Sequence, residues 1–306
     1  RGWLMTGLWP NRLAIPAIAA PMTAVSGPDL VITACRNGVI GSFPTHNAPT
    51  VEVLDAWLAR IRREVAPADA PVAPNLVVHR SNQRRDEDLD CLIRHGVELV
   101  IASVGSPEAV IEPLHCIGAQ VYADVASLDH AKRALDVGAD GLVLLTAGAG
   151  GQTGWANPFA FVRAVRETYS GPIVLAGGIS DGRSMLAAKI LGADLVYLGT
   201  RFIATRERMA DDDYRSALVA SSLDAVRLST RVGGIPGSLL RCWLDEHADV
   251  GPPEGFDQDR LIRNSGAWSA GHSVSGVHEV MTVAQLISTL ADQYALACSQ
   301  ELALHE

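Results

Sequence analysis

The chain has 306 residues, of which 48% are hydrophobic and 19% are charged, proportions that are ordinary for a globular protein. Its net charge of -9, with no run of Lys or Arg longer than a pair, argues against binding nucleic acid through the phosphate backbone. No apolar stretch reaches the roughly 18 residues that a membrane span needs, and residues 1–11 lack an apolar signal core, so we expect a cytoplasmic protein without a membrane partner.

Eight short apolar runs have the length and composition of strands that are buried on both faces. Amphipathic stretches with helical spacing lie between most of them, at 51–65, 86–95, 128–137, 158–169 and 181–191. Alternation of strand and helix implies parallel strands, and eight repeats predict a (β/α)₈ TIM barrel within residues 1–205. The eight runs are residues 15–21, 39–43, 74–78, 99–103, 120–125, 141–145, 172–176 and 195–199.

The pattern changes after the eighth run. Residues 206–263 are rich in charge and contain the turn-prone segments 233–237 and 251–253. We therefore predict a small, mainly helical insertion over residues 206–265, which could act as a substrate lid. Residues 266–306 form the last segment, in which helical apolar spacing returns over 280–304, and we expect it to pack back on the barrel.

The loops after the seventh and eighth strands of such barrels often hold a phosphate group. Here these loops contain residues 176–183 and 199–201. Glycines let the backbone approach a phosphate closely, and the N–H groups at the start of the helix near Asp181 would point at the anion. The same glycines could form tight turns without a ligand, but two such loops in this order favour a phosphate site.

Several motifs at strand ends resemble those of the nitronate monooxygenase and 2-nitropropane dioxygenase family. They are residues 20–22, 38–41, Asn75 and 148–151, together with the two phosphate loops. The resemblance covers about residues 15–205, with a further patch near 268–277. It implies an FMN cofactor whose phosphate lies at Gly177, Gly178, Gly199 and Thr200. The other cofactor-binding positions that it implies are Ala20, Pro21, Met22, Asn75, Asp124, Gly150, Gly151, Gln152 and Ala176.

Gln152 is the largest departure from this family, whose typical members have a histidine in its place as the catalytic base. A histidine with a pKa of about 6.5 can take a proton from a carbon acid, whereas a glutamine amide only forms hydrogen bonds. Deprotonation of a nitroalkane by residue 152 is therefore excluded. Oxidation of a preformed nitronate anion needs no base at this position.

Three other polar residues are candidates for catalysis. His272 stands where many relatives carry a glutamine, so it either supplies the missing imidazole or forms hydrogen bonds within a loop. Asp124 ends the fifth strand, where some relatives have a lysine, and it either contacts substrate or lies in a salt bridge or at the surface. His46, after the second strand, either contacts substrate or supports its loop. Trp155 and Phe159 either line the pocket or pack into the core.

Other side chains limit the alternatives. The five cysteines are widely spaced without a C-x-x-C pair, so we predict reduced thiols and neither a disulfide framework nor a metal site. A phosphate-binding barrel that acts as a lyase or isomerase, or that only binds a ligand, would also fit the loops. A lyase would want a Schiff-base lysine, yet the two lysines, Lys132 and Lys189, both lie in helical stretches.

The function that we predict first is FMN-dependent oxidation of nitronates or similar small stabilised carbanions with O₂ as co-substrate. The alternative keeps FMN but takes hydride from NAD(P)H and reduces an enoyl thioester, a quinone or another acceptor. A G-x-G-x-x-G element is missing, although barrel flavoenzymes can bind nicotinamide without one. In both cases the partner is a small-molecule substrate, and a homodimer is left open.

Overall fold

A closed parallel barrel forms the centre of the computed structural model, which describes residues 9, 11–263 and 266–303. The expected ends at residues 1 and 306 and the junction at 264–265 lie outside the described residues. The barrel strands run in the order β2-β1-β9-β8-β6-β5-β4-β3. All eight predicted strands are confirmed, as β1 (Ala17–Ala19), β2 (Ile40–Gly41), β3 (Asn75–Val77), β4 (Leu99–Ser103), β5 (Gln120–Val125), β6 (Gly141–Leu145), β8 (Ile173–Ala176) and β9 (Leu195–Leu198).

The two ends of this sheet meet between β2 and β3. The backbone N–H of Asn75 donates to the carbonyl of Phe43 at 2.8 Å, and that of Ala73 donates to Gly41 at 2.8 Å. Parallel bridges at Pro44–Asn75 and Gly41–Val72 continue the same pairing. The sheet is therefore a closed barrel, which leaves no free strand edge.

The inside of the barrel is filled by alternate residues of the strands. Tyr122 of β5, Val143 of β6 and Leu195 of β9 belong to a buried cluster distinct from the larger core between strands and helices. Because side chains in a strand alternate between faces, the next inward positions are Asp124 on β5 and Tyr197 on β9. These positions lie one layer closer to the carboxyl ends of the strands.

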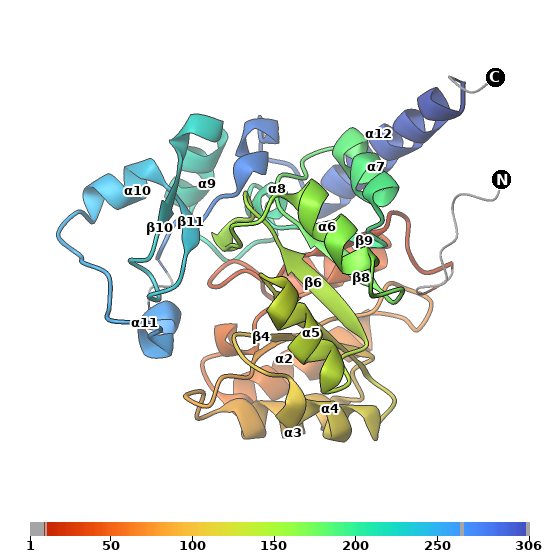
Figure 1. Ribbon diagram of the computed structural model, residues 1–306, viewed down its shortest axis with the longest axis vertical. Helices are drawn as coiled ribbons and strands as arrows, with labels where there is room; N and C mark the ends of the chain where they lie inside the picture. The colour runs from red at the N-terminus through yellow and green to blue at the C-terminus, as the bar shows by residue number, and fades with distance from the viewer. Residues whose placement is uncertain (1–8, 10, 264–265, 304–306) are drawn as a thin grey trace.

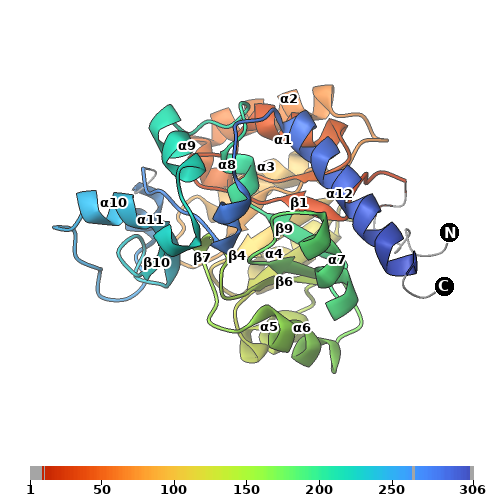
Figure 2. The ribbon, with the colours of Figure 1, turned by 90° about the horizontal axis from the view of Figure 1, so that it is seen from above.

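Helices surround the barrel, as Figures 1 and 2 show. Two of them, α1 and α4, were not predicted. In α1 the consecutive buried residues Leu30, Val31 and Ile32 hide the helical period, and α4 contains Pro113. The helices are α1 (Pro28–Arg36), α2 (Val51–Glu64), α3 (Arg85–His95), α4 (Glu108–His115), α5 (Leu128–Asp136), α6 (Pro158–Arg166) and α7 (Gly182–Leu191).

The C-terminal helix α12 (Val283–Ala303) completes this ring. β9 is followed only by the short helix α8 (Thr200–Ile203), and α12 lies between α1 and α7 (Figure 2). A Cβ atom at Gly182 would overlap the backbone of Tyr294, so α7 and α12 approach each other closely. The expected return of the last segment to the barrel is confirmed for its described residues. None of the described helices combines the length and hydropathy needed to cross a bilayer.

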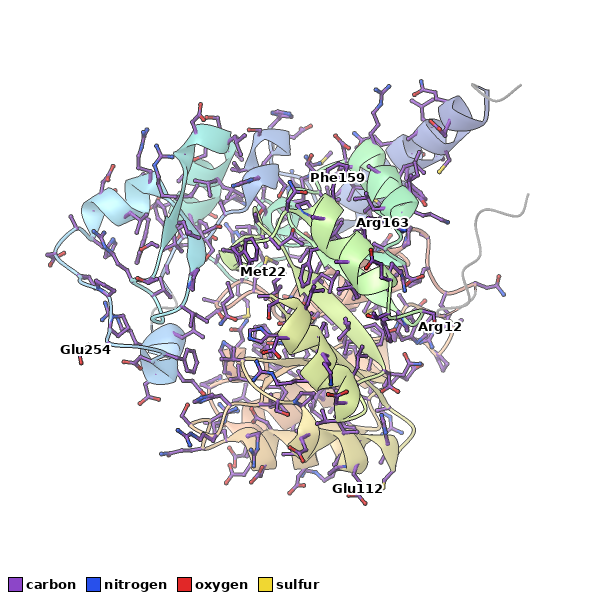
Figure 3. The ribbon with its side chains drawn as sticks, viewed as in Figure 1. Arg12, Met22, Glu112, Phe159, Arg163 and Glu254 are labelled. Atoms are coloured by element: carbon purple, nitrogen blue, oxygen red, sulfur yellow. The ribbon has the colours of Figure 1, made fainter. Side chains whose placement is uncertain are left out.

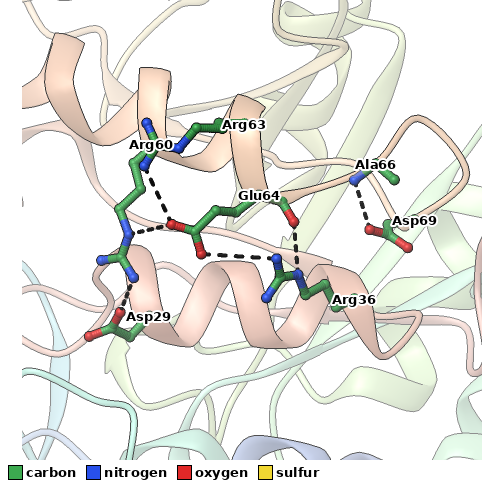
Figure 4. A network of polar contacts seen from close by, with 7 residues as sticks. All are labelled: Asp29, Arg36, Arg60, Arg63, Glu64, Ala66 and Asp69. Carbon is green, nitrogen blue, oxygen red and sulfur yellow. Dashed lines mark hydrogen bonds and ion pairs between the residues drawn. The ribbon is translucent and has the colours of Figure 1, made fainter.

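A network of ion pairs joins α1 to α2 on the surface (Figure 4). The Nε atom of Arg60 lies 2.9 Å from Glu64, and its guanidinium reaches Asp29 at 2.6 Å. Arg36 donates from Nε to the carbonyl oxygen of Glu64 at 2.8 Å. The hydrogen bond from Arg60 lowers the pKa of Glu64. Exposed pairs of this kind add little to stability, so the network mainly fixes the register of the two helices.

The segment after β9 contains a hairpin as well as helices. Its strand β11 (Gly237–Leu240) pairs with β10 (Val226–Ser229) and also with β7 (Gly151–Gln152) of the loop after β6. The sequence did not predict this three-stranded sheet, because each strand is too short to show a period. The other elements of the segment are α9 (Asp212–Val219), η2 (Leu223–Ala225), α10 (Arg241–Glu246) and α11 (Gln258–Arg263).

This insertion reaches across the carboxyl ends of the strands. Ser81, in the loop after β3, donates to Gln258 at 3.0 Å, and the rings of His79 and Phe256 lie 4.9 Å apart. At the other side, β11 is joined to β7. Figure 1 shows these elements together at the left of the barrel. The insertion therefore covers the end of the barrel at which TIM-barrel sites form.

Candidate active site

A cavity of about 200 Å³ opens at the carboxyl ends of the barrel strands. Its floor consists of the uppermost inward-facing side chains, because the layers below are filled by the apolar cluster of the barrel interior. Strand alternation therefore decides which residues reach it. The floor residues are Ala20, Asn75, Ser103, Asp124, Leu145, Ala176 and Tyr197.

One end of the cavity is built by backbone from the two glycine loops. Gly177 and Gly178 have φ angles of 127° and 72°, which favour glycine. A Cβ atom at Gly178 would meet no heavy atom within 4 Å, so this position faces open space. Within the described chain, the N–H groups of Gly178, Gly199 and Thr200 have no acceptor. Unpaired donors around an open space fit the phosphate of a flavin nucleotide.

The segment that returns after the insertion holds this end in place. Thr200 Oγ1 accepts a hydrogen bond from the N–H of Gly271 at 3.0 Å. A Cβ atom at Gly150 would stand 2.8 Å from the same Gly271 nitrogen, so only glycine allows the loop after β6 to pack there. Gly150 and Gly151 both line the cavity. The three loops therefore depend on one another for their positions.

The wall next to β1 and β3 carries the other predicted cofactor positions. Ala20, Pro21 and Met22 all line the cavity, and the N–H of Met22 donates to Ser26 at 3.1 Å. Met22 is labelled in Figure 3, where the barrel meets the insertion. Asn75 is only 5% exposed and its amide donates to the carbonyl of Ile101 at 3.1 Å. These contacts fix the side chain of Asn75 at the floor.

Gln152 lines the cavity from β7, where it pairs with Gly237 of β11. The backbone at this position is thus held by the insertion. Because its amide cannot titrate near neutral pH, the side chain offers hydrogen bonds but takes no proton. Gln152 thus lies beside the cavity. Its pairing with β11, which fixes its backbone, was not indicated by the sequence.

Asp124 and Tyr197 are the two floor residues with unsatisfied polar atoms. Asp124 Oδ1 and the Tyr197 hydroxyl are buried and have no hydrogen-bond partner. Burial raises the pKa of Asp124 to about 7 and holds the pKa of Tyr197 well above its usual value. Tyr197 was missed by the sequence analysis. Its hydroxyl, the one polar side-chain group of an otherwise apolar eighth strand, is the signal that could have found it.

His46 also reaches the cavity, from the 3₁₀ helix η1 (Thr45–Asn47). Its Nε2 atom lies 3.0 Å from the hydroxyl of Thr23, while its Nδ1 atom is buried without a partner. Burial, with a smaller effect of Arg84, lowers the pKa of His46 to about 4. The ring is therefore neutral at physiological pH and is poorly suited to proton transfer there.

His272 is placed differently from the other candidates. It begins the 3₁₀ helix η3 (His272–Gly276), its side chain is exposed, and it does not line the cavity. Its ring packs on Gly148 from outside, and its N–H donates to the carbonyl of Gly148 at 2.9 Å. The structure therefore does not bring an imidazole at 272 together with Gln152. The neighbouring Ser273 lines the cavity instead.

Two aromatic residues suggested by the sequence as wall or core do neither. Trp155 is 85% exposed and Phe159 is 61% exposed. Both are absent from the cavity lining, and Figure 3 shows Phe159 on α6 with Arg163. The loop after β7 and the first turn of α6 turn them toward solvent.

The insertion gives the cavity an apolar mouth. This was not predicted, because the segment as a whole is rich in charge and its apolar residues are scattered. Among the described residues that line the cavity there is neither lysine nor arginine. Open space beyond the floor is thus bounded mainly by hydrocarbon. The apolar lining residues that the insertion contributes are Val232, Ile235, Leu239 and Leu261, and Ile203 and Ala267 line the cavity from the segments on either side of it.

Comparison with known proteins agrees with this geometry. The sequence model of the nitronate monooxygenase family matches residues 10–249. A nitronate monooxygenase of Paraburkholderia phytofirmans is 28% identical over an aligned length of 333 residues. The alignment covers 90% of this chain and 88% of the relative. A Mycobacterium tuberculosis protein, (3aS,4S,5R,7aS)-5-hydroxy-7a-methyl-1-oxo-octahydro-1H-indene-4-carboxyl-CoA dehydrogenase, is 28% identical over 255 residues, or 82% of this chain and 70% of that protein.

Solved structures share the fold. FabK from Thermotoga maritima has a TM-score of 0.81 at 23% identity, with 96% of this chain and 97% of that chain covered. The nitroalkane oxidase from Streptomyces ansochromogenes has a TM-score of 0.83 at 24% identity, with coverage of 94% and 98%. The α/β barrel with its surrounding helices is therefore a shared architecture.

Proposed function

Because the chain belongs to the nitronate monooxygenase family and is a flavin-dependent oxidoreductase, we propose that its cofactor is FMN and that it oxidises nitronates or similar small stabilised carbanions, with O₂ as the final electron acceptor. One observation carries this proposal. The cavity combines a backbone cradle for a phosphate with a wall on which Gln152 stands in place of a base.

The form of the cradle supports a cofactor that carries a phosphate, as FMN does. Gly178 offers an open face, and the short helix α8 begins at Thr200 with an unpaired N–H group. A terminal phosphate would take hydrogen bonds from these donors while the ring lies toward Asn75 and the barrel axis. When bound, the flavin would accept electrons from the substrate and pass them to O₂.

Substrate selection follows from Gln152. Its amide group can donate a hydrogen bond to a nitronate oxygen, but it cannot remove a proton from a neutral nitroalkane. His46 is no substitute, because its lowered pKa of about 4 makes it a weak base. Asp124 lies at the cavity floor, at the end of β5, and not on the strand that carries Gln152. The chain is therefore suited to substrates that arrive already deprotonated.

A second function is favoured by the apolar mouth. Residues such as Ile235, Leu239 and Leu261 would contact a hydrophobic acceptor better than a small nitronate. In this case NAD(P)H reduces the flavin, and the acceptor is an enoyl thioester, a quinone or a similar compound. The same residues support residues 206–265 as a substrate-facing insertion over the barrel of residues 1–205, with the remaining chain returning to that barrel.

Anaerobic reduction of the flavin separates the two functions. The purified protein, loaded with FMN, is mixed with ethylnitronate, NADH or NADPH, and loss of the visible flavin absorbance is followed. Rapid bleaching by ethylnitronate, followed by O₂ consumption on mixing with air, is the expected result. Bleaching by a nicotinamide alone would favour the reductase, and a colourless protein that takes up no FMN would overturn both.

A further inference from the structure

We propose, on the premise of FMN binding above, that Asp124 and Tyr197 form a pair of hydrogen-bond donors at the cavity floor that holds the acceptor edge of the flavin ring, with Asp124 as a neutral carboxylic acid. The family resemblance implied Asp124 only as a cofactor contact, without a protonation state. Tyr197 was not implied at all.

The fold aims both side chains at one space. Asp124 follows Tyr122 as the next inward residue of β5, and Tyr197 follows Leu195 in the same way on β9. Both line the cavity. The two side chains are near enough that a negative charge on Asp124 would raise the pKa of Tyr197 further. They therefore lie in the uppermost layer of the barrel, across from each other and directly under the cavity.

Both groups lack partners that comparable groups in the chain possess. The hydroxyl of Tyr214, which also lines the cavity, donates to the carbonyl of Ser269, and Tyr169 donates to Asp140 at 2.7 Å. By contrast, Asp124 Oδ1 and the Tyr197 hydroxyl bond to nothing in the described chain. An unsatisfied buried polar group is destabilising, so a ligand that pairs with both groups offsets a penalty already present in the fold.

The charge around Asp124 favours its protonated form. The titratable residues of the cavity lining are His46, Tyr197 and Tyr214 besides Asp124 itself, and no arginine or lysine is among them. The His46 ring is neutral because burial lowers its pKa to about 4. A carboxylate here would thus have no countercharge, which agrees with a pKa raised to about 7 by burial.

The chemistry of the two donors points to the ligand. A neutral carboxyl and a phenol each offer one O–H, whereas a carboxylate only accepts hydrogen bonds. Along one edge of the oxidised flavin ring, the two carbonyl oxygens and the N1 and N5 nitrogens accept hydrogen bonds, and only N3–H donates one. A planar ring over Asp124 would also exclude water and raise its pKa further. Protonation of Asp124 and binding of the ring therefore favour each other.

The sign of the pH effect follows from this linkage. Below about pH 7 the free protein already holds the proton, so titration of Asp124 no longer changes the affinity for FMN. Above that pH the carboxyl must take up a proton on binding, and the Kd should rise by up to about tenfold per pH unit. Asp124→Asn keeps a neutral donor of similar shape and should remove this rise.

The test is titration of the apoprotein with FMN, followed by quenching of flavin fluorescence between about pH 5.5 and pH 9. Wild type and Asp124→Asn are compared directly, which cancels the titration of the FMN phosphate itself. Tyr197→Phe should weaken binding about tenfold at every pH, because it removes one donor. Tyr122→Phe is the matched control, since its hydroxyl is equally unpaired but lies outside the cavity lining, and it should leave the Kd unchanged.

Each outcome of these titrations either supports or overturns the proposed pair of donors. If Asp124→Asn shows the same pH profile as wild type, or if Tyr197→Phe binds FMN as wild type does, the donor pair is wrong while FMN binding stands. If wild type binds no FMN at any pH, the proposed function fails and the donor pair with it. Thermal melts of the apoproteins, read by circular dichroism, identify a variant that is unfolded, and Asp124→Ala then replaces Asp124→Asn in the comparison.

Discussion

The two ends of the cavity are built in different ways. The end proposed to hold the phosphate consists of the backbone of Gly177, Gly178, Gly199 and Thr200. The mouth consists of the side chain of Gln152 and of side chains from the insertion. Backbone donors cannot be exchanged without changing a glycine, whereas the side chains of the mouth can vary singly. If the function proposed above is right, the backbone end selects the cofactor through its phosphate, and the mouth selects the substrate. Breaking each end separately tests this division.

The largest effect is expected for Gly178→Val. Its Cβ would occupy the open space at the cradle, so FMN should bind at least about 100-fold more weakly as several charge-assisted hydrogen bonds are lost. Retained flavin after purification and the Kd of added FMN measure this. Gly96→Val is the control, because Gly96 has a similar φ of 63° and equally open surroundings at the end of α3. Equal FMN loss in both variants would show that strain, not the phosphate site, is responsible.

Changes at Gln152 test the mouth without touching the cradle. Wild type should reduce its flavin roughly 100-fold faster with preformed ethylnitronate than with freshly dissolved nitroethane, because position 152 cannot take the carbon proton. Gln152→His should narrow that difference and leave the Kd of FMN unaltered. Comparable wild-type rates with the two compounds would mean that another group acts as the base.

A smaller effect is expected at the apolar mouth. Leu261→Ala removes hydrocarbon from the lining and should raise the KM of an apolar acceptor roughly fivefold, with little change in FMN affinity. Leu228→Ala is the matched control, since Leu228 is a leucine of the same insertion that is 68% exposed and does not line the cavity. If both variants behave alike, the mouth does not contact the substrate.

The smallest effect is expected at His272. Its exposed ring lies outside the cavity, so His272→Gln should keep turnover within about twofold of wild type across roughly pH 5.5 to 8.5. Steady-state rates with the best substrate at each pH measure this. A profile that flattens while FMN stays bound would instead revive a titrating role for this imidazole.

The difference between the two ends also explains what the sequence could predict. Each barrel strand is a short apolar run between turn signals, and the glycines at 177, 178 and 199 are visible without any knowledge of tertiary structure. The loops that carry the cradle were therefore identified from local signals alone. Their identification required only the order of the strands along the chain.

What escaped prediction depends on contacts between distant segments. The pairing of Gly151 and Gln152 with β11 joins residues far apart in sequence, and neither strand has a period of its own. Tyr197 was missed because a buried strand is apolar on both faces, so its inward side is set only by closure of the barrel. The exposure of His272 likewise results from packing of η3 on Gly148.

The position of α12 has a consequence for how the chain reaches its native state. The ring of helices closes between α7 and α1 only when residues 283–303 arrive, after the whole insertion has been synthesised. Closing so long a loop adds little to the entropy cost, since each doubling of loop length adds only about 0.6 kcal/mol, but contacts of high sequence separation form slowly. Until then, the faces of α1 and α7 that α12 covers stay open to solvent, and α7 is the helix that follows the phosphate loop. We therefore expect the loop before α7 to reach its final position only after α12 has packed against α7.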